Sequence, residues 1–301
     1  MSQGWRRFAA RLASRLVRPK AAEDAAIFNE WQARGIHITP ANFYSPIPDT
    51  RALGPEIWTA CDTPGLDLNV EKQVAFLRDT CLPFQSEYND LPATSDDPYI
   101  FKLDNDAFSG IDPLVYYSLI RKFKPRMILE IGSGHSSLLA ARATSAGSEA
   151  RRIIVDPYPR YFVEQGSRGA ELLRKPAEHL PLSYFEALQA NDILFIDSSH
   201  AVRMGGEVNR IFLLAIPRLP PGVLVHVHDI FLPYDYPHDL VVNRLLFWSE
   251  QYLLQAYLAH NPRAEILLAH NFLERGQVDA LREIFPRALY PGGVSFWFRT
   301  K

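Results

Sequence analysis

The sequence has little cysteine, no long hydrophobic run and no excess of charge of one sign. Its two cysteines, Cys61 and Cys81, stand twenty positions apart without a CxxC or Cys/His spacing, which argues against a zinc knuckle and requires no oxidising compartment. No uncharged apolar run approaches the roughly 18 to 20 residues that a helix needs to span a bilayer. The formal net charge of −2 gives no general electrostatic footprint for nucleic acid. We therefore expect a cytoplasmic protein without a nucleic-acid partner.

The sequence contains enough apolar residues for a full core. Of its 301 residues, 47% are hydrophobic and 22% are charged, close to the averages of soluble globular domains. At about 150 residues per domain, this length indicates one large domain, or one domain with an accessory segment. The composition excludes a disordered, collagen-like or disulfide-scaffold chain.

The first twenty residues form a basic amphipathic segment. Its apolar residues recur at spacings of three and four and share one helical face: Trp5, Phe8, Leu12 and Leu16. The segment has no acid, and its basic residues are Arg6, Arg7, Arg11, Arg15, Arg18 and Lys20. This pattern suits a terminal helix packed on the domain, a peripheral membrane or partner contact through residues 1–20, or a transit peptide.

The rest of the chain changes character near residue 112. Residues 21–112 are rich in proline, aspartate and aromatic residues, and we interpret them as an accessory or cap region. The pattern predicts helices over Val70–Leu82 and Pro113–Lys122. Asp112 is the expected N-cap of the second helix, with proline at the first helical position.

After Pro125, short apolar runs alternate with helical stretches, which is typical of βαβ units and a parallel sheet. We expect residues 113–301 to form this α/β domain. The predicted strands are Met127–Ile131, Arg152–Val155, Glu171–Leu173, Ile193–Ile196, Val223–Val227, Glu265–Leu268 and Val294–Phe298. In such sheets a ligand binds beyond the carboxyl ends of the strands, where the strand order reverses.

A glycine turn follows the first predicted strand. The run from Glu130 to Ser136 leads into a helical stretch, and its glycines suit a tight turn at which a ligand approaches the main chain closely. The second strand ends in Asp156, where a carboxylate would accept hydrogen bonds from two ribose hydroxyls. The alternative for Asp156 is a cap for the turn at residues 157–159. Together, the turn and Asp156 indicate a nucleoside-containing cofactor.

These residues resemble the first motif of the class I S-adenosylmethionine-dependent methyltransferases, an acidic residue, any residue, then Gly-x-Gly-x-Gly. Glu130, Gly132 and Gly134 match it, and Ser136 replaces the last glycine. The resemblance covers about residues 113–300. It implies a Rossmann-like seven-stranded sheet, mostly parallel, with an antiparallel C-terminal hairpin. It also implies that S-adenosylmethionine is bound by Glu130, Gly132, Ser133, Gly134, Ser136, Asp156 and Asp197.

Two alternatives stay open. One is a nicotinamide-dinucleotide-dependent oxidoreductase, because the two cofactors share ribose and adenine. In that alternative the third glycine position falls on Ser137, and Glu130 is unexplained. The other is a noncatalytic scaffold that binds the cofactor.

Acids and histidines end the fourth and fifth predicted strands. Here the sequence resembles the metal-dependent O-methyltransferases of the catechol and macrolide-sugar types and their cephalosporin hydroxylase-like relatives. The resemblance places a divalent cation at Asp197, His228 and Asp229, and a base at His200, where the catechol enzymes carry a lysine. Oxygen ligands alone suit magnesium, whereas an imidazole ligand favours manganese or another transition metal. The alternative is that Asp197 and Asp229 position the methionine end of the cofactor and the substrate through hydrogen bonds.

We therefore expect an S-adenosylmethionine-dependent methyltransferase that acts on a hydroxyl of a small molecule: a sugar, a phenol or a secondary metabolite. His200 is the expected general base, because an imidazole titrates near neutrality. The sequence leaves the acceptor and the oligomeric state open.

Overall fold

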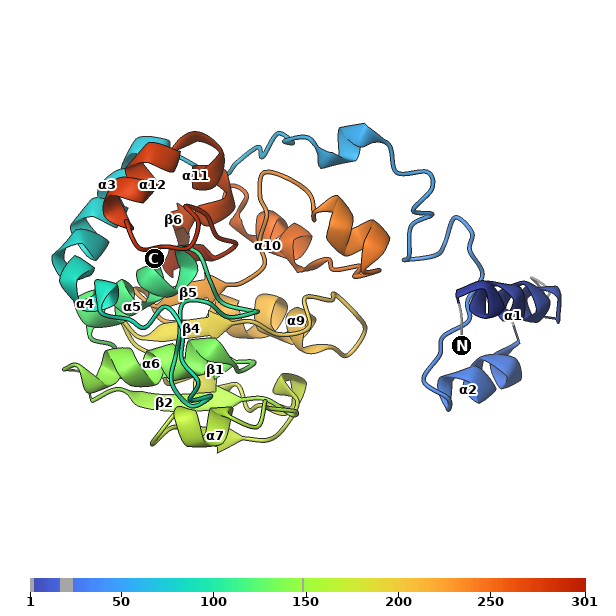
Figure 1. Ribbon diagram of the computed structural model, residues 1–301, viewed down its shortest axis with the longest axis horizontal. Helices are drawn as coiled ribbons and strands as arrows, with labels where there is room; N and C mark the ends of the chain where they lie inside the picture. The colour runs from blue at the N-terminus through green and yellow to red at the C-terminus, as the bar shows by residue number, and fades with distance from the viewer. Residues whose placement is uncertain (1–2, 17–23, 148) are drawn as a thin grey trace. The chain divides into compact units, whose positions relative to one another are not determined.

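The computed structural model describes residues 3–16, 24–147 and 149–301 (Figure 1). The chain divides into two compact units, Met1–Ile57 and Trp58–Lys301. We call the first the N-terminal unit and the second the sheet unit. A short 3-10 turn, η2 (Pro55–Trp58), lies at the boundary.

The N-terminal unit contains the helices α1 (Gln3–Leu16) and α2 (Ala25–Gln32). Asp24 caps α2, because its side chain accepts hydrogen bonds from two backbone N–H groups of the first turn. Helix α1 covers most of the basic amphipathic segment. Part of that segment lies outside the described residues, namely Arg18, Lys20 and the side chains of Arg6, Arg7, Phe8, Arg15 and Leu16. No helix in the described ranges combines the length and the apolar character that a membrane crossing requires.

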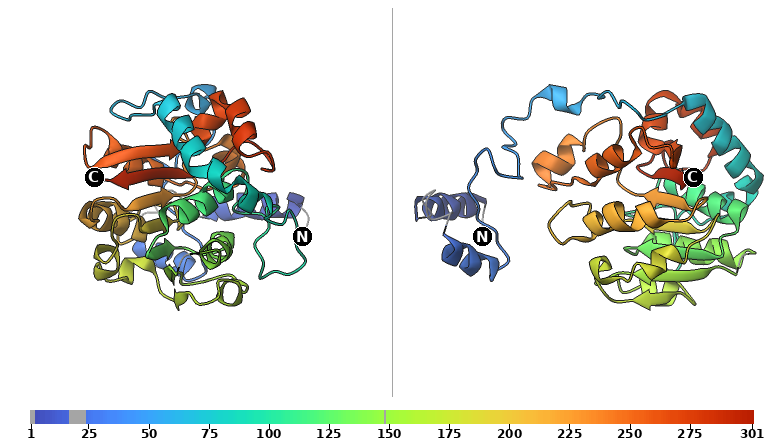
Figure 2. Two further views of the ribbon diagram at one scale, coloured as in Figure 1. Left: turned by 90° about the vertical axis from the view of Figure 1, so that its left-hand side faces the viewer. Right: turned by 180° about the vertical axis from the view of Figure 1, so that it is seen from behind.

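Within the described ranges, seven strands form one sheet in the order β3-β2-β1-β4-β5-β7-β6 (Figure 1, Figure 2). Strands β1 to β5 pair in parallel, and β7 pairs antiparallel with both β5 and β6. The strands are β1 (Met127–Ile131), β2 (Arg151–Val155), β3 (Glu171–Leu173), β4 (Ile193–Ile196), β5 (Leu224–Val227), β6 (Ala264–Ala269) and β7 (Phe296–Thr300). This confirms the predicted Rossmann-like sheet and its antiparallel C-terminal pair.

Helices cover both faces of the sheet, because successive side chains of a strand point to opposite faces and both sets here are apolar (Figure 2). In β1, Ile128 belongs to one core cluster and Leu129 to the other. Packed into the first cluster are residues of α3 (Val70–Cys81), α5 (Asp112–Phe123), α6 (His135–Ser145), α7 (Val163–Gly166), α11 (His270–Gly276) and α12 (Val278–Ile284). The second receives residues of η4 (Ala177–His179), α8 (Ser183–Glu186), α9 (Glu207–Arg210), η5 (Ile211–Ala215), η6 (Ile216–Arg218) and α10 (Glu250–Leu258). Helix α4 (Gln85–Asn89) adds its buried Tyr88 to the first cluster, and the remaining short helices are η3 (Leu82–Phe84) and η7 (Asp239–Asn243).

The predicted capping role of Asp112 is wrong. The N-cap of α5 is Ile111, and Asp112 is the first residue of the helix, followed by Pro113. The Asp112 carboxylate instead accepts hydrogen bonds from the backbone of residues 294 and 295 and from His270. Tertiary partners therefore hold this side chain, and the sequence around the helix start does not reveal them.

Residues 58–112 belong to the same compact unit as the sheet. Helix α3 confirms the predicted helix in this stretch, and its Leu77 and Cys81 are fully buried in the core cluster that also contains α5. This segment therefore contributes to the core against which the strands pack.

Candidate active site

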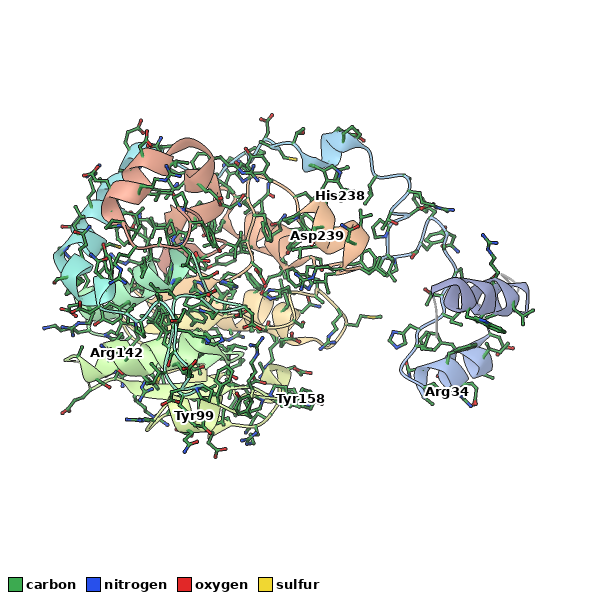
Figure 3. The ribbon with its side chains drawn as sticks, in the orientation of Figure 1. Arg34, Tyr99, Arg142, Tyr158, His238 and Asp239 are labelled. Carbon is green, nitrogen blue, oxygen red and sulfur yellow. The ribbon has the colours of Figure 1, made fainter. Side chains whose placement is uncertain are left out.

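A crevice of about 1010 Å³ opens beyond the carboxyl ends of β1, β2, β4 and β5. All of its lining residues belong to the sheet unit. Tyr158, after β2, and Asp239, in η7 after β5, are two of them (Figure 3). The strand order reverses at β1 and β4, so the crevice lies where this class of sheet binds ligands.

The β1–α6 turn needs a glycine at its first position. Gly132 has a φ of +87°, and a Cβ added there would lie 1.7 Å from the backbone oxygen of Asp197. Gly134 differs, because an added Cβ would meet nothing within 4 Å. Space beside Gly134 is therefore open to a ligand, whereas Gly132 is required by the turn itself. Gly132, Ser133, Gly134 and Ser136 all line the crevice.

Glu130 lies beneath this turn and is not among the residues that line the crevice. Its carboxylate accepts a hydrogen bond of 2.6 Å from the Ser136 hydroxyl. Burial raises the pKa of Glu130 to about 8, although hydrogen bonds from Ser136 and Ser137 act in the opposite direction. Glu130 therefore holds the start of α6 in place through Ser136, which is the serine that replaces the last glycine of the motif.

Asp156 lines the crevice at the end of β2. Its Oδ2 accepts a hydrogen bond of 2.5 Å from the Ser133 hydroxyl, and its Oδ1 accepts one of 2.7 Å from the backbone N–H of Tyr158. The second contact is the turn cap considered as an alternative. Each carboxylate oxygen has two lone pairs, so Asp156 keeps acceptor capacity for a ligand.

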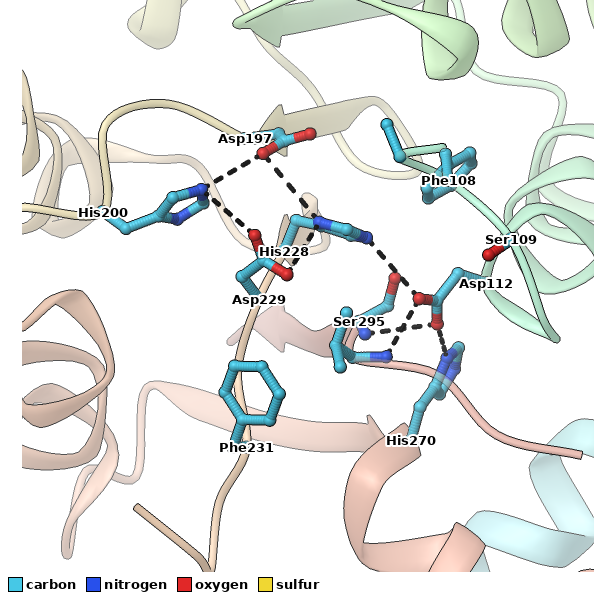
Figure 4. A network of polar contacts seen from close by, with 12 residues as sticks. Phe108, Ser109, Asp112, Asp197, His200, His228, Asp229, Phe231, His270 and Ser295 are labelled. Carbon is cyan, nitrogen blue, oxygen red and sulfur yellow. Dashed lines mark hydrogen bonds and ion pairs between the residues drawn. The ribbon is translucent and has the colours of Figure 1, made fainter. Parts of the chain in front are cut away.

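The structure brings together the four residues predicted from the ends of β4 and β5 (Figure 4). Asp197, His228 and Asp229 line the crevice, whereas His200 is buried beside the two carboxylates and is not among the lining residues. Nε2 of His200 lies 3.4 Å from Oδ1 of Asp197 and 3.4 Å from Oδ2 of Asp229. Nδ1 of His228 lies 3.9 Å from Oδ1 of Asp197 and 3.6 Å from Oδ1 of Asp229. Two imidazoles thus face the same pair of carboxylates.

Each imidazole also has an acid on its other side. Nδ1 of His200 lies 2.9 Å from Oε2 of Glu250, the first residue of α10. Nε2 of His228 lies 3.5 Å from Oδ2 of Asp112, the first residue of α5. Sequence reasoning missed both acids, because they lie on helices far from the strand ends in the chain. The sequence carries one signal for each of these two acids: an acidic residue stands at the start of a helix that is otherwise rich in apolar residues.

This group of charges holds protons on the histidines and removes them from Asp197. Burial alone lowers the pKa of His200, but hydrogen bonds to Asp197 and Glu250 raise it to about 10. Burial also opposes protonation of His228, and the charges of Asp197 and Asp229 nevertheless raise the pKa of that ring well above its usual value. The pKa of Asp197 is lowered despite burial, mainly by His228 and His200.

Two carboxylates and an imidazole could hold a metal ion here. Among the described residues, Asp197, His200 and Asp229 each offer a ligand atom, and these atoms lie within 4.8 Å of one another. His228 approaches the same carboxylates from its own position on β5. Mixed oxygen and nitrogen donors suit manganese, iron or zinc better than magnesium.

Comparison with known proteins gives a family for the central part of the chain. Residues 129–230 match a family described as a methyltransferase domain. A protein of Archaeoglobus fulgidus, described as uncharacterized, is 31% identical over 167 residues, which are 51% of this chain and 75% of that protein.

Solved structures with a similar fold include two methyltransferases. The O-methyltransferase from Bacillus cereus in complex with SAH is 16% identical, with a TM-score of 0.39, over 75% of this chain and 91% of that one. The plantazolicin methyltransferase BpumL, in complex with a desmethylPZN analog and SAH, is 11% identical, with a TM-score of 0.37, over 76% of this chain and 98% of that one.

Proposed function

Because the chain belongs to the class I S-adenosylmethionine-dependent methyltransferases, we propose that it methylates a hydroxyl oxygen of a small molecule. The observation that carries this proposal is one crevice with two chemically different ends. The glycine turn and Asp156 line one part of it, and His228 and Asp229 line another, with Asp197 next to both and His200 buried beside the two carboxylates. The volume of about 1010 Å³ is at the upper end of the usual range for ligand pockets, which supports room for an acceptor beside a nucleoside.

The residues at the first end fit the cofactor. S-adenosylmethionine, when bound, supplies a methyl group on a sulfonium with a good leaving group. The open backbone at Gly134 allows close approach, and Asp156 would accept hydrogen bonds from ribose hydroxyls. Ser133, Ser136 and Asp197 line the same space, whereas Glu130 acts through Ser136. The chain's task is to orient the acceptor oxygen, exclude water and manage one proton.

A divalent cation at Asp197, His228 and Asp229 is part of the proposal. The short distances among these groups support it, and the donor types favour manganese or another transition metal. Bound there, a cation would lower the pKa of an acceptor hydroxyl. Because His200 lies nearer to both carboxylates than His228 does, the assignment needs a separate test: His228→Gln should weaken Mn²⁺ binding more than His200→Gln.

His200 is the proposed general base. Its Nε2 lies 3.4 Å from Asp197 and 3.4 Å from Asp229, which both line the crevice, and Glu250 holds Nδ1, which fixes the orientation of the ring. Asp197 and Glu250 together raise the pKa of this ring. A cation held by Asp197 would weaken one of these two contacts, and the lower pKa of His200 would then allow Nε2 to accept the proton of the acceptor.

The test is methyl transfer to a panel of acceptors. The protein is incubated with Mn²⁺ and S-adenosylmethionine that carries an isotope-labelled methyl group, together with sugars, phenols and carboxylic acids in separate reactions. We expect mass spectrometry to find the label as a methyl ether of a sugar or phenol. Label found only in carboxylate esters, or on nitrogen, would contradict the hydroxyl proposal while leaving methyl transfer intact.

A further inference from the structure

A buried acid lies behind the acceptor end of the crevice. Asp112 is only 2% exposed and does not line the crevice. Its carboxylate lies between His228, which ends in the crevice, and His270, which begins α11 on the far side (Figure 4). Neither the glycine motif nor the strand-end residues account for an acid at this position.

The Asp112 carboxylate is held firmly. Oδ2 accepts a hydrogen bond of 2.9 Å from the backbone N–H of Val294, and Oδ1 accepts one of 3.2 Å from that of Ser295. Oδ1 also lies 2.5 Å from Nδ1 of His270. The chain makes room for this group with Gly293, where an added Cβ would lie 2.1 Å from Oδ1. The position of the carboxylate is therefore fixed by the backbone around it.

The ring of His228 has a different acid at each nitrogen. Nε2 is buried, lies 3.5 Å from Oδ2 of Asp112 and makes no hydrogen bond within the described part of the chain. Nδ1 points to Asp197 and Asp229. An imidazole whose Nε2 carries a proton toward one acid has its lone pair on Nδ1 when it binds a metal.

We propose that Asp112 is a positioning residue that keeps the proton of His228 on Nε2 and thereby directs Nδ1 toward Asp197 and Asp229. This rests on the proposed function, in which His228 is a metal ligand. A ligating histidine commonly donates its other ring N–H to a carboxylate, which fixes both the tautomer and the orientation of the ring. A merely structural anchor for the backbone of Val294 and Ser295 would need no relation to His228.

Asparagine at position 112 separates these two roles. Its single amide oxygen should stay on the side of His270 and Ser295, where two donors point at Oδ1. Its NH₂ group then takes the place of Oδ2, where it loses the hydrogen bond from the Val294 N–H and faces His228, so Nε2 must accept a hydrogen bond instead of donating one. The proton moves to Nδ1, which is the wrong nitrogen for metal binding.

The first measurement is calorimetric titration of the metal-free full-length protein with Mn²⁺. We expect Asp112→Asn to weaken Mn²⁺ binding about 10- to 100-fold, the usual effect of losing an outer-shell partner. The matched control is His270→Gln, which changes the other imidazole on the same carboxylate and should shift the Mn²⁺ affinity less than about 3-fold. Gly293→Ala displaces the carboxylate without removing it and should also weaken Mn²⁺ binding.

The second measurement determines which nitrogen of the His228 ring carries the proton. In ¹⁵N-histidine-labelled protein loaded with diamagnetic Zn²⁺, or metal-free at a pH above the pKa of the ring, the long-range ¹H–¹⁵N spectrum should show Nε2 of His228 protonated in the wild type and unprotonated in Asp112→Asn. His228→Gln identifies the signal. If the wild type takes up no Mn²⁺, the metal part of the proposed function fails, and this spectrum alone decides the role of Asp112.

Two results would overturn the proposal. One is an unprotonated Nε2 of His228 in the wild type. The other is equal weakening of Mn²⁺ binding by Asp112→Asn and His270→Gln, which would make Asp112 a structural anchor. Titration with S-adenosylhomocysteine checks each variant, because a correctly folded variant should keep its affinity for that ligand within about twofold.

Discussion

His200 and His228 are the same residue type, face the same two carboxylates and each have a further acid behind the ring. What distinguishes them is the nitrogen that faces Asp197 and Asp229. His200 presents Nε2 and is held at Nδ1, whereas His228 presents Nδ1 and is approached at Nε2. Substitution of each ring can therefore separate proton transfer from metal binding.

The catalytic role of His200 is tested by His200→Gln. If the ring takes the acceptor proton, this change should lower kcat about 10²- to 10⁴-fold, the usual contribution of positioned proton transfer. The affinity for S-adenosylhomocysteine should stay nearly unchanged, because Asp156 lines the crevice whereas His200 is not among its lining residues. Steady-state kinetics and calorimetry measure the two effects, and full activity in this variant would remove His200 from the mechanism.

His200 should also make the metal-free protein less stable as the pH rises. Its pKa is raised to about 10 in the folded chain, while an unfolded histidine titrates near about 6.5. The charged ring therefore contributes its full stabilisation below about pH 6.5 and loses it as the pH rises through about 10. Urea denaturation with chelator, across this range, should show a steeper loss for the wild type than for His200→Gln. Parallel curves would show that the ring is not held protonated.

Substitution of Asp229 tests whether the site binds a metal ion. Its φ of +56° lies in the left-handed region, so Asp229→Asn keeps a residue that tolerates this backbone while removing the charge. We expect weaker Mn²⁺ binding and activity that excess Mn²⁺ partly restores, because loss of one ligand weakens a site without erasing it. Chelator should mimic the change in the wild type. Asp239→Asn, at the rim of the same crevice, is the control and should behave as the wild type.

At the scale of the elements, the sequence predicts the strands far better than their partners. Runs such as Ile193–Ile196 are apolar throughout because both faces of the sheet are covered, and each predicted strand is present with its ends shifted by two residues or fewer. The strand ends then bring Asp197, His200, His228 and Asp229 together as expected. Glu250 and Asp112 could not be placed, since the approach of α10 and α5 to these rings depends on tertiary packing.

The two glycines of the β1–α6 turn have different roles: the fold requires Gly132, whereas we expect Gly134 to be required only for ligand binding. Gly132→Ala should lower the melting temperature and abolish cofactor binding, because its Cβ would collide with the backbone of Asp197 at a φ of +87°. Gly134→Ala meets no atom of the chain, so it should leave the melting temperature unchanged and weaken only S-adenosylhomocysteine binding. Thermal unfolding and calorimetry distinguish the two. Unchanged binding in Gly134→Ala would mean that no ligand approaches this backbone.

At the scale of the whole molecule, the crevice and the basic segment belong to different compact units. Every residue that lines the crevice lies in the unit Trp58–Lys301, whereas α1 lies in Met1–Ile57. Any binding activity of residues 1–20 should therefore be separable from cofactor binding.

The proposed membrane contact follows from this separation. If the basic segment is a surface helix, the full chain should sediment with anionic vesicles at low salt and be released as added salt screens its arginines. Deletion of residues 1–20 should abolish sedimentation and leave S-adenosylhomocysteine affinity unchanged. Equal sedimentation of the two chains would leave only the packed terminal helix or the transit peptide.

The most direct measurement is calorimetric titration of the wild type and Asp156→Ala with S-adenosylhomocysteine, and of the wild type with a nicotinamide dinucleotide. We expect the wild type to bind only the sulfur ligand. Asp156→Ala should bind it at least about 10-fold more weakly, because a hydrogen bond to a charged group contributes about 1.5 to 3 kcal/mol. Binding of the nicotinamide dinucleotide with no heat from S-adenosylhomocysteine would contradict the assignment of the crevice to methyl transfer.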